Sequence, residues 1–561
     1  MTGYRAHICQ CLGRISTFRR DSPVSECEGR RKTGKELVTE VLAIAGGLTE
    51  LGLRPGEVVA VAALNSDFYL EWMLAITFVG GIVAPLNYRW SLEEVKAAME
   101  SASPAILVVD EQCKSWAPKL WGSIPSVRFH LSIDPSVNIQ THGIIARCVP
   151  ESQEVSIFDF QWSPKSIAII CFTSGTTGRP KGVALSHAAL VVQSLAKLAV
   201  VGYNEDDVYL HTAPLCHIGG ISSALAMLMV GACHVVMPKF SAELAFQFIE
   251  QHSVTSFITV PAMMADLVSF SGNLRIGGSV RRILNGGGRL SQELCQKASQ
   301  AFPNAKLLSA YGMTEACSSI TFMTLYNPEK QGTSASPHDF SSDTGQTVPG
   351  PSGICVGKPP PHVEIQIRKN GKLVNSFVAG SILTRGMHVM DGYWCNAPDN
   401  LSPVFCKCGW LETGDIGWVD DYGNLWLQGR SKDRIKSGGE NIYPEEVEAV
   451  LLQHPGILES VIVGIPDTRL SEAVAACIRV KTEWNWIDGN SSFLSPDVKS
   501  QNLSCKILQS HCKRMHLSGF KIPKIFIPWK KSFPSTSSGK LMRDKVKEEA
   551  MAHLQALHSN L

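Results

Sequence analysis

Extended and helical patterns alternate along the first part of the chain, and this alternation constrains the fold more than any other feature. Ser91 and Glu94 have the spacing of a capping box at the start of one predicted helix. Strands that alternate with helices form mainly parallel sheets, so the sequence predicts an α/β fold. The predicted elements are, in order, a helix at 35–51, a strand at 58–63, a helix at 67–78, a strand at 82–86, a helix at 91–99 and a strand at 105–109.

A second α/β pattern starts after Gly429, where a helix opened by Pro444 precedes an apolar strand at 460–465. We place a domain boundary there, which gives an N-terminal domain of residues 1–430 and a C-terminal domain of residues 431–561. The full length of 561 residues is ample for buried cores in both domains. Two further segments are rich in small and polar residues, and we expect surface loops at 326–352 and 482–500.

Composition excludes several classes of protein. The chain has 52 Lys and Arg against 50 Asp and Glu, and this near balance gives no sequence-wide footprint for nucleic acid. Its 17 cysteines lack zinc-site spacing and are expected to be free, buried thiols. The longest uncharged stretch, 208–238, is interrupted by His211, Pro214 and His217, so we expect a loop and then a buried helix at 222–230. No membrane span and no secretory signal peptide are predicted.

The strongest local signal is a run of glycines, hydroxyls and one lysine at 173–182, TSGTTGRPKG. It follows a β-rich run at 167–172 and precedes a helix that Ser186 can cap. Small residues allow the backbone to approach a polyphosphate, whose oxygens accept from N–H groups, hydroxyls and the lysine. Pro180 and Gly182 depart from the Walker A pattern, so the loop is of another kind. The residues that we assign to phosphate binding are Thr173, Ser174, Gly175, Thr176, Thr177, Gly178 and Lys181.

Five more segments follow in a set order: NGGG at 285–288, YGMTE at 311–315, TGD at 413–415, GRSKDRIKSGGEN at 429–441 and SGK at 538–540. Together with the phosphate loop they resemble the adenylate-forming, AMP-binding superfamily, which contains acyl- and aryl-CoA ligases, adenylation domains and luciferases. The resemblance spans nearly the whole chain. It implies a large N-terminal domain of layered α/β subdomains and a small, mobile C-terminal α+β domain. It also implies that ATP, Mg²⁺ and coenzyme A are used.

The resemblance assigns a nucleotide-binding role to each segment of the larger domain. Tyr311 is expected to line the adenine pocket, and Thr314 to donate to the α-phosphate. Glu315 offers the carboxylate oxygen that a hard cation such as Mg²⁺ prefers. Asp415 is expected to accept the ribose hydroxyls, with Arg430 beside it. The remaining nucleotide contacts that the resemblance implies are Gly286, Gly287, Gly288 and Gly312.

The resemblance gives the C-terminal segments roles in the two half-reactions. Lys540 is expected to bridge the substrate carboxylate and the α-phosphate during adenylation, where a compact ammonium suits the growing negative charge. Lys432 is at the family's hinge position, about which the C-terminal domain rotates before the second step. Ser437, Gly438 and Gly439 are then expected to line the tunnel for the thiol of coenzyme A.

The acid is suggested by two features. His217, Ile218, Gly219 and Gly220 are similar to the segment that borders the family's acyl pocket. Ile218, Gly219 and Gly220 would make a flat slot that suits an aromatic ring rather than a long alkyl chain. The segments at 87–91, 284–288 and 310–318 resemble the plant ligases that join 2-succinylbenzoate to coenzyme A on the route to phylloquinone. That acid is an aromatic dicarboxylate, and spacing alone does not identify the partner of its second carboxylate.

Other interpretations stay open on the sequence alone. Within the family the acid could be 4-coumarate-like or of medium chain length, or the chain could be an adenylation domain that serves a carrier protein. Outside catalysis, a dead member could bind an adenylate or an aryl acid, but the presence of both Glu315 and Lys540 argues against it. The ending Ser559-Asn560-Leu561 is similar to the S-K-L peroxisomal address. We therefore predict a peroxisomal location and binding to the import receptor, with the chloroplast as the alternative because the first twenty residues are basic.

Overall fold

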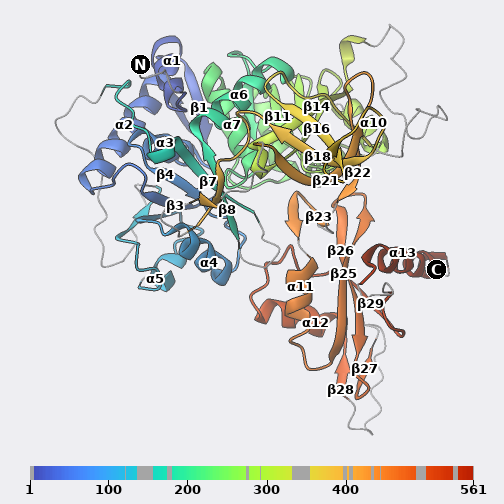
Figure 1. Cartoon of the computed structure of the whole chain (residues 1–561). Coiled ribbons are helices and arrows are strands. Elements are labelled where there is room, and N and C mark those ends of the chain that lie inside the picture. Colours follow the sequence, from blue (N-terminus) through green and yellow to red (C-terminus); the bar gives the residue numbers. More distant parts are fainter. Residues whose placement is uncertain are drawn as a thin grey trace. The chain divides into compact units, whose positions relative to one another are not determined.

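The computed structural model describes residues 6–120, 122–134, 156–173, 180–272, 277–290, 292–330, 354–395, 401–402, 409–430, 435–442, 444–487, 501–534 and 541–559 (Figure 1). The chain forms two compact units. The larger comprises residues 1–88, 95–173 and 181–431, and the smaller comprises residues 89–94, 174–180 and 432–561.

The predicted alternation of helices and strands is confirmed in a mainly parallel eight-stranded sheet of the larger unit. Its strand order is β20-β19-β8-β7-β4-β3-β5-β6, and the strands from β7 to β6 are parallel. Strands β5 and β7 are buried on both faces, as their apolar sequences require in a sheet covered on two sides. The strands are β3 (Val58–Ala62), β4 (Ile82–Pro85), β5 (Ile106–Val109), β6 (Phe129–Ser132), β7 (Ile167–Thr173), β8 (Lys181–Ser186), β19 (Gly392–Trp394) and β20 (Leu401–Ser402).

A second eight-stranded sheet has the order β14-β13-β12-β11-β9-β10-β1-β2. The strands from β13 to β1 are parallel, and each edge strand is antiparallel to its neighbour. The strands are β1 (Pro23–Cys27), β2 (Arg30–Thr33), β9 (Val208–His211), β10 (Cys233–Val236), β11 (Ser256–Thr259), β12 (Arg282–Asn285), β13 (Lys306–Met313) and β14 (Ser318–Tyr326).

The third sheet of the larger unit is antiparallel, with the order β15-β22-β21-β18-β16-β17. Its strands are β15 (Ile354–Gly357), β16 (Glu364–Lys369), β17 (Lys372–Leu373), β18 (Gly380–Arg385), β21 (Leu411–Val419) and β22 (Leu425–Arg430).

Helices join the parallel strands of the first two sheets (Figure 1). Ser66 and Ser186 cap α3 and α6 by accepting a hydrogen bond from the third residue of each helix, as expected for Ser186. The predicted buried helix at 222–230 is the greater part of α7. The helices are α1 (Gln10–Phe18), α2 (Gly34–Glu50), α3 (Asp67–Phe78), α4 (Leu92–Ala102), α5 (Trp116–Leu120), α6 (His187–Val201), α7 (Ile218–Val230), α8 (Ala242–His252), α9 (Pro261–Ser271) and α10 (Gln292–Ala301), with short 3₁₀ turns η1 (Pro164–Ser166), η2 (Thr314–Ala316) and η3 (Pro328–Lys330).

The smaller unit is built on a five-stranded sheet with the order β24-β23-β26-β25 and with β29 paired to β26. The helix opened by Pro444 and the strand at 460–465 are confirmed as α11 and part of β25. The loop expected at 482–500 is wrong in part, because Trp484–Trp486 pairs in parallel with Gln501–Leu503. The elements are β23 (Ile435–Ser437), β24 (Glu440–Ile442), α11 (Pro444–Leu451), β25 (Ile457–Asp467), β26 (Ser471–Val480), β27 (Trp484–Trp486), β28 (Gln501–Leu503), α12 (Cys505–Arg514), β29 (Ile525–Pro528) and α13 (Arg543–Ser559).

The structure also bears on the predictions made for the cysteines and for a membrane span. The cysteines that the structure describes are free, and each is buried or half-buried, which confirms the expected thiols. Among the described helices, none is long and apolar enough to cross a bilayer.

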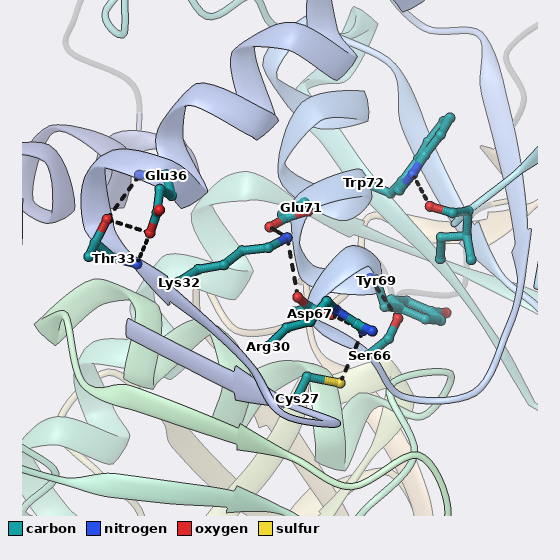
Figure 2. A network of polar contacts seen from close by, with 11 residues as sticks. Cys27, Arg30, Lys32, Thr33, Glu36, Ser66, Asp67, Tyr69, Glu71 and Trp72 are labelled. Carbon is teal, nitrogen blue, oxygen red and sulfur yellow. Dashed lines mark hydrogen bonds and ion pairs between the residues drawn. The ribbon is translucent and has the colours of Figure 1, made fainter. Parts of the chain in front are cut away.

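A network of buried charges attaches the β1–β2 hairpin to α3. Helix α3 is buried almost all round, so its carboxylates at Asp67 and Glu71 need cationic partners. Figure 2 shows Arg30 and Lys32 extending from β2 toward them. Arg30 lies 3.0 Å from Asp67, and the Lys32 ammonium lies 3.2 Å from Asp67 and 2.5 Å from Glu71.

The Glu71 carboxylate makes stability depend on pH. Burial raises the pKa of Glu71 to about 7, against the opposing charge of Lys32. A carboxyl group with a raised pKa contributes stability that is present below its ordinary pKa and is lost as pH rises through 7. The free energy of unfolding of Glu71→Gln, relative to that of the natural chain, should therefore rise by on the order of 2 kcal/mol between about pH 5 and pH 8. Urea midpoints at both pH values measure this difference.

Glu50→Gln is the matched control, because Glu50 lies on the neighbouring helix α2, is exposed and is not one of the charges that act on Glu71. The difference in free energy of unfolding between this control and the natural chain should not change with pH. A constant difference for Glu71→Gln as well would contradict the assignment of this pH dependence to the buried network.

Candidate active site

Two of the predicted nucleotide segments, NGGG at 285–288 and YGMTE at 311–315, lie at the carboxyl ends of neighbouring strands of the second sheet, β12 and β13. Strands β11, β12 and β13 are parallel, and Asn285 at the end of β12 is paired in register with Thr259 at the end of β11 and with Ser309 within β13. Gly286 donates its N–H to the Thr259 carbonyl at 2.9 Å, and Asn285 Nδ2 donates to the Gly288 carbonyl at 2.7 Å. The NGGG turn therefore starts where β12 ends. This edge is where open α/β sheets bind ligands.

Tyr311 and Asp415 meet across 104 residues of sequence. Tyr311 lies on β13, and its hydroxyl donates to Asp415 Oδ2 at 2.7 Å, with both side chains buried. The Thr413 hydroxyl accepts from the Asp415 N–H at 3.2 Å and donates to the Ile382 carbonyl. The structure thus brings together the aromatic ring and the carboxylate that the resemblance assigns to adenine and ribose.

Glu315 is held in a tight turn after β13. The turn η2 contains Thr314 and Glu315, and Glu315 is only 5% exposed. The Met390 N–H donates to the Glu315 carbonyl at 2.9 Å, and the Tyr393 hydroxyl donates to Glu315 Oε1 at 3.0 Å. Sequence reasoning missed Tyr393, because nothing in its surroundings marks it and it lies 78 residues away.

The phosphate loop connects two antiparallel strands. Thr173 ends β7, Lys181 begins β8, and these two residues are paired in register. The sequence predicted a helix after the loop, but β8 intervenes before Ser186 caps α6. Lys181 therefore lies on a strand rather than near a helix N-terminus. Its ammonium stands 5.5 Å from the centre of the Tyr393 ring, so Tyr393 touches both Lys181 and Glu315.

The donor set at Glu315 suits Mg²⁺. The Tyr393 hydroxyl donates a hydrogen bond to Oε1 of Glu315. A carboxylate oxygen from one side chain, beside substrate phosphates, is a usual arrangement for this cation. Among the described residues, no cluster of three or more metal-binding side chains forms a cage. Glu315, with phosphate oxygens and water, would hold the ion, which supplies neutralisation of phosphate charge.

The predicted acyl-pocket segment lies at the start of α7. His217 is the N-terminal flanking residue of the helix, and its Nε2 lies 3.4 Å from Asn87 Nδ2. A Cβ at Gly220 would lie 2.3 Å from the Pro214 carbonyl oxygen, so this position requires glycine. A Cβ at Gly219 would lie 3.8 Å from Ile258 Cδ1 of β11.

Buried Asn65 shapes the approach to α7, and sequence reasoning missed it. Its Nδ2 donates to the Ala213 carbonyl at 3.1 Å, and its Oδ1 accepts from the Leu215 N–H at 2.7 Å. A single asparagine 148 residues earlier in the chain thus fixes the backbone just before His217.

The remaining predicted residues divide into three groups. In the smaller unit, Ser437 ends β23, and Gly438 and Gly439 form the turn to β24 with φ of 58° and 85°. In the larger unit, the Arg430 backbone is paired in register with Asp415. The predicted residues that lie outside the described part of the chain are Ser174, Gly175, Thr176, Thr177, Gly178, Lys432, Lys540, Asn560 and Leu561.

Comparison with known families gives two matches. Residues 15–394 match the model of the AMP-binding enzyme family, and residues 446–540 match the AMP-binding enzyme C-terminal domain. The two matched segments together contain every site residue proposed above except those between 394 and 446.

Relatives and solved structures cover almost the full chain. A protein of Arabidopsis thaliana named "2-succinylbenzoate–CoA ligase, chloroplastic/peroxisomal" is 49% identical over 99% of each chain. A double mutant of o-succinylbenzoate CoA synthetase from Bacillus subtilis, bound with its product analogue, is 26% identical and covers 97% of this chain and 98% of that chain, with a TM-score of 0.75. The same Bacillus enzyme in complex with ATP and a magnesium ion is 27% identical over 96% of this chain and 99% of that chain, with a TM-score of 0.64.

Proposed function

Because the chain belongs to the AMP-binding enzyme family, we propose that it is an acid–CoA ligase that acts through an acyl adenylate, with 2-succinylbenzoate as the acid. The resemblance drawn from the motifs and the adenylate-forming fold class are both confirmed by the family matches and the structural neighbours. The substrates are ATP, the aromatic acid and coenzyme A, and Mg²⁺ is the metal cofactor.

The proposed reaction has two displacements. A carboxylate oxygen of the acid attacks the α-phosphorus of ATP, which forms the P–O bond of the acyl adenylate and expels pyrophosphate. The thiolate of coenzyme A then attacks the acyl carbonyl, which forms the thioester and expels AMP. The first step develops negative charge at phosphorus, so cationic and N–H groups beside the α-phosphate supply the catalysis.

The described residues of the larger unit support the first step. The Asp415 carboxylate, oriented by the Tyr311 hydroxyl, suits recognition of ribose hydroxyls. Thr314 and Lys181 are proposed to contact the phosphates, with the phosphate loop between β7 and β8. Tyr393 orders both Lys181 and Glu315, so it is a positioning residue for this step.

The observation that carries the choice of acid is the 49% identity to the Arabidopsis ligase over 99% of each chain. Gly219 agrees with it, because this glycine faces Ile258 of β11, from which a Cβ would lie 3.8 Å, and a missing side chain there favours a flat ring. A 4-coumarate-like or medium-chain acid is the alternative within the family.

A panel of acids tests the proposal. With ATP, Mg²⁺ and coenzyme A present, 2-succinylbenzoate should give a kcat/KM at least about tenfold above coumarate, benzoate and octanoate, because a site built for a polar group rejects acids that lack it. AMP and CoA-thioester formation are measured for each acid. A preference for coumarate or octanoate would replace the proposed acid with that alternative, and no turnover of any acid would support a binding protein instead.

The proposed location is the peroxisome, with the chloroplast as the alternative, in agreement with the name of the Arabidopsis relative. The tail Ser559-Asn560-Leu561 supports the peroxisome and its import receptor. The basic N-terminal stretch is folded from residue 7 onward in the larger unit. His7, Ile8 and Cys9 are fully buried before α1, so removing them would expose the core.

A further inference from the structure

A lysine is fully buried between helices α6 and α7. Lys197 lies on α6 and is 0% exposed. Its Nζ donates to the hydroxyls of Ser222 at 2.5 Å and Ser223 at 3.1 Å, both on α7. Among the residues that the structure describes, no carboxylate forms an ion pair with it. Lysine is rarely found fully buried without a charged partner, because removing an ammonium from water is costly.

This lysine lies near the proposed acyl-pocket segment and near the turn η2, which carries the proposed α-phosphate contact Thr314. Ser222, which accepts from Lys197, contacts the Gly219 carbonyl at 3.5 Å, and Gly219 belongs to the proposed acyl-pocket segment. Lys197 is also close enough to Cys317, the residue that follows η2, to interact with it electrostatically. The ammonium is thus next to both the acyl-pocket segment and the turn that carries Thr314.

We propose that Lys197 pairs with the second carboxylate of the aromatic acid and so determines the specificity for a dicarboxylate. This inference rests on the proposed function. The four-carbon stem of lysine is flexible, so Nζ can turn from the two hydroxyls toward an anion. In a site from which water is excluded, an ion pair is far stronger than in water, so the pair would discriminate sharply against an acid without that carboxylate.

The electrostatics of the surroundings agree with a role for an anionic ligand. Burial lowers the pKa of Lys197 to about 7, and the groups that face it do not titrate near that value. Burial raises the pKa of Cys317 to about 12 and also raises the pKa values of Tyr203 and Tyr209, whose hydroxyls face Ser223. An anion beside Lys197 would favour the ammonium and relieve the cost of burying it.

The test compares two substrates that differ by one group. 2-Succinylbenzoate and 4-oxo-4-phenylbutanoate share the ring and the activated side chain, but only the first carries the ring carboxylate. The natural chain should favour the dicarboxylate in kcat/KM by about 100-fold or more, the order expected for a buried, hydrogen-bonded charge pair. Lys197→Met and Lys197→Gln should abolish this preference, mainly through KM for 2-succinylbenzoate, and should leave the monocarboxylate nearly unchanged.

Ser194→Ala is the matched control, because Ser194 is a buried polar residue of α6 whose hydroxyl donates to the Leu190 carbonyl within the same helix. It should keep the natural preference. If the Lys197 variants keep the preference, or lose activity equally on both acids, the lysine is structural and the inference is wrong. If the natural chain does not turn over 2-succinylbenzoate at all, the proposed function itself fails.

If the Lys197 variants do not fold, a measurement on the natural chain tests whether Lys197 pairs with the second carboxylate. The pH profile of kcat/KM reports the ionisation of the free enzyme. Because the ammonium is lost as pH rises through about 7, the preference for the dicarboxylate should fall steadily above that pH. A preference that is constant from pH 6 to pH 9 would overturn the inference.

Discussion

Replacing Lys540 by Ala is expected to slow adenylate formation by about 10²–10³-fold, the usual loss when one preorganised contact to a developing charge is removed. We propose this role from the resemblance of SGK at 538–540 to the family motif. The ammonium would stabilise only the charge that grows as the carboxylate attacks the α-phosphorus. Thioester formation from an adenylate that is already made should scarcely change. Pyrophosphate release measures the first step, and single-turnover consumption of preformed adenylate with coenzyme A measures the second.

Lys432→Pro is the complementary variant at the proposed hinge. Proline restricts φ to about −65°, which should hinder the rotation and slow the second step while the first step continues. If Lys540→Ala slows both steps equally, the proposal of two conformations is wrong for this chain.

Replacing Gly312 by Ala is expected to reduce adenylation by about 100-fold or more. A Cβ at this position would lie 1.6 Å from the Ser318 carbonyl oxygen and 2.9 Å from the Ser319 Cα. Backbone atoms of a paired strand cannot move aside cheaply, so the β13–β14 hairpin must shift, and it carries Thr314 and Glu315 at its turn. A displacement of about 1 Å in such a group can cost 10²-fold in rate.

The control for this substitution is Gly278→Ala, because a Cβ at Gly278 would meet nothing within 4 Å. Both variants should keep a cooperative thermal transition, which separates a local displacement from loss of the fold. Natural pyrophosphate release by Gly312→Ala would show that the hairpin turn does not position the reacting groups.

The fold could be predicted where the pattern of neighbouring residues alone determines a helix or a strand. The alternation at 35–109 predicted α2 to β5, because fully buried strands leave continuous apolar runs. The short strand β8 was missed, since its first residues, Lys181 and Gly182, were counted as part of the phosphate loop and only four more residues precede α6. Strand β27 was missed because a pair of three-residue strands has too few residues to show periodicity.

The site could be predicted only in part for a similar reason. Tyr311, Glu315 and Asp415 stand in motifs, so their sequence neighbours identify them. Tyr393 and Lys197 act through residues far away in sequence, and each looks ordinary in its own segment. A lysine inside an amphipathic helix is usually exposed, and only the packing of α6 on α7 shows that this one is buried.

The central claim is that this chain joins 2-succinylbenzoate to coenzyme A through an adenylate. The most direct measurement incubates the purified chain with 2-succinylbenzoate, ATP and Mg²⁺, first without and then with coenzyme A, and follows pyrophosphate, AMP and thioester. We predict enzyme-bound acyl adenylate and about one equivalent of pyrophosphate without coenzyme A, and then equal amounts of AMP and 2-succinylbenzoyl-CoA once it is added. Release of ADP and phosphate, or thioester formation with no adenylate on the way, would contradict the account.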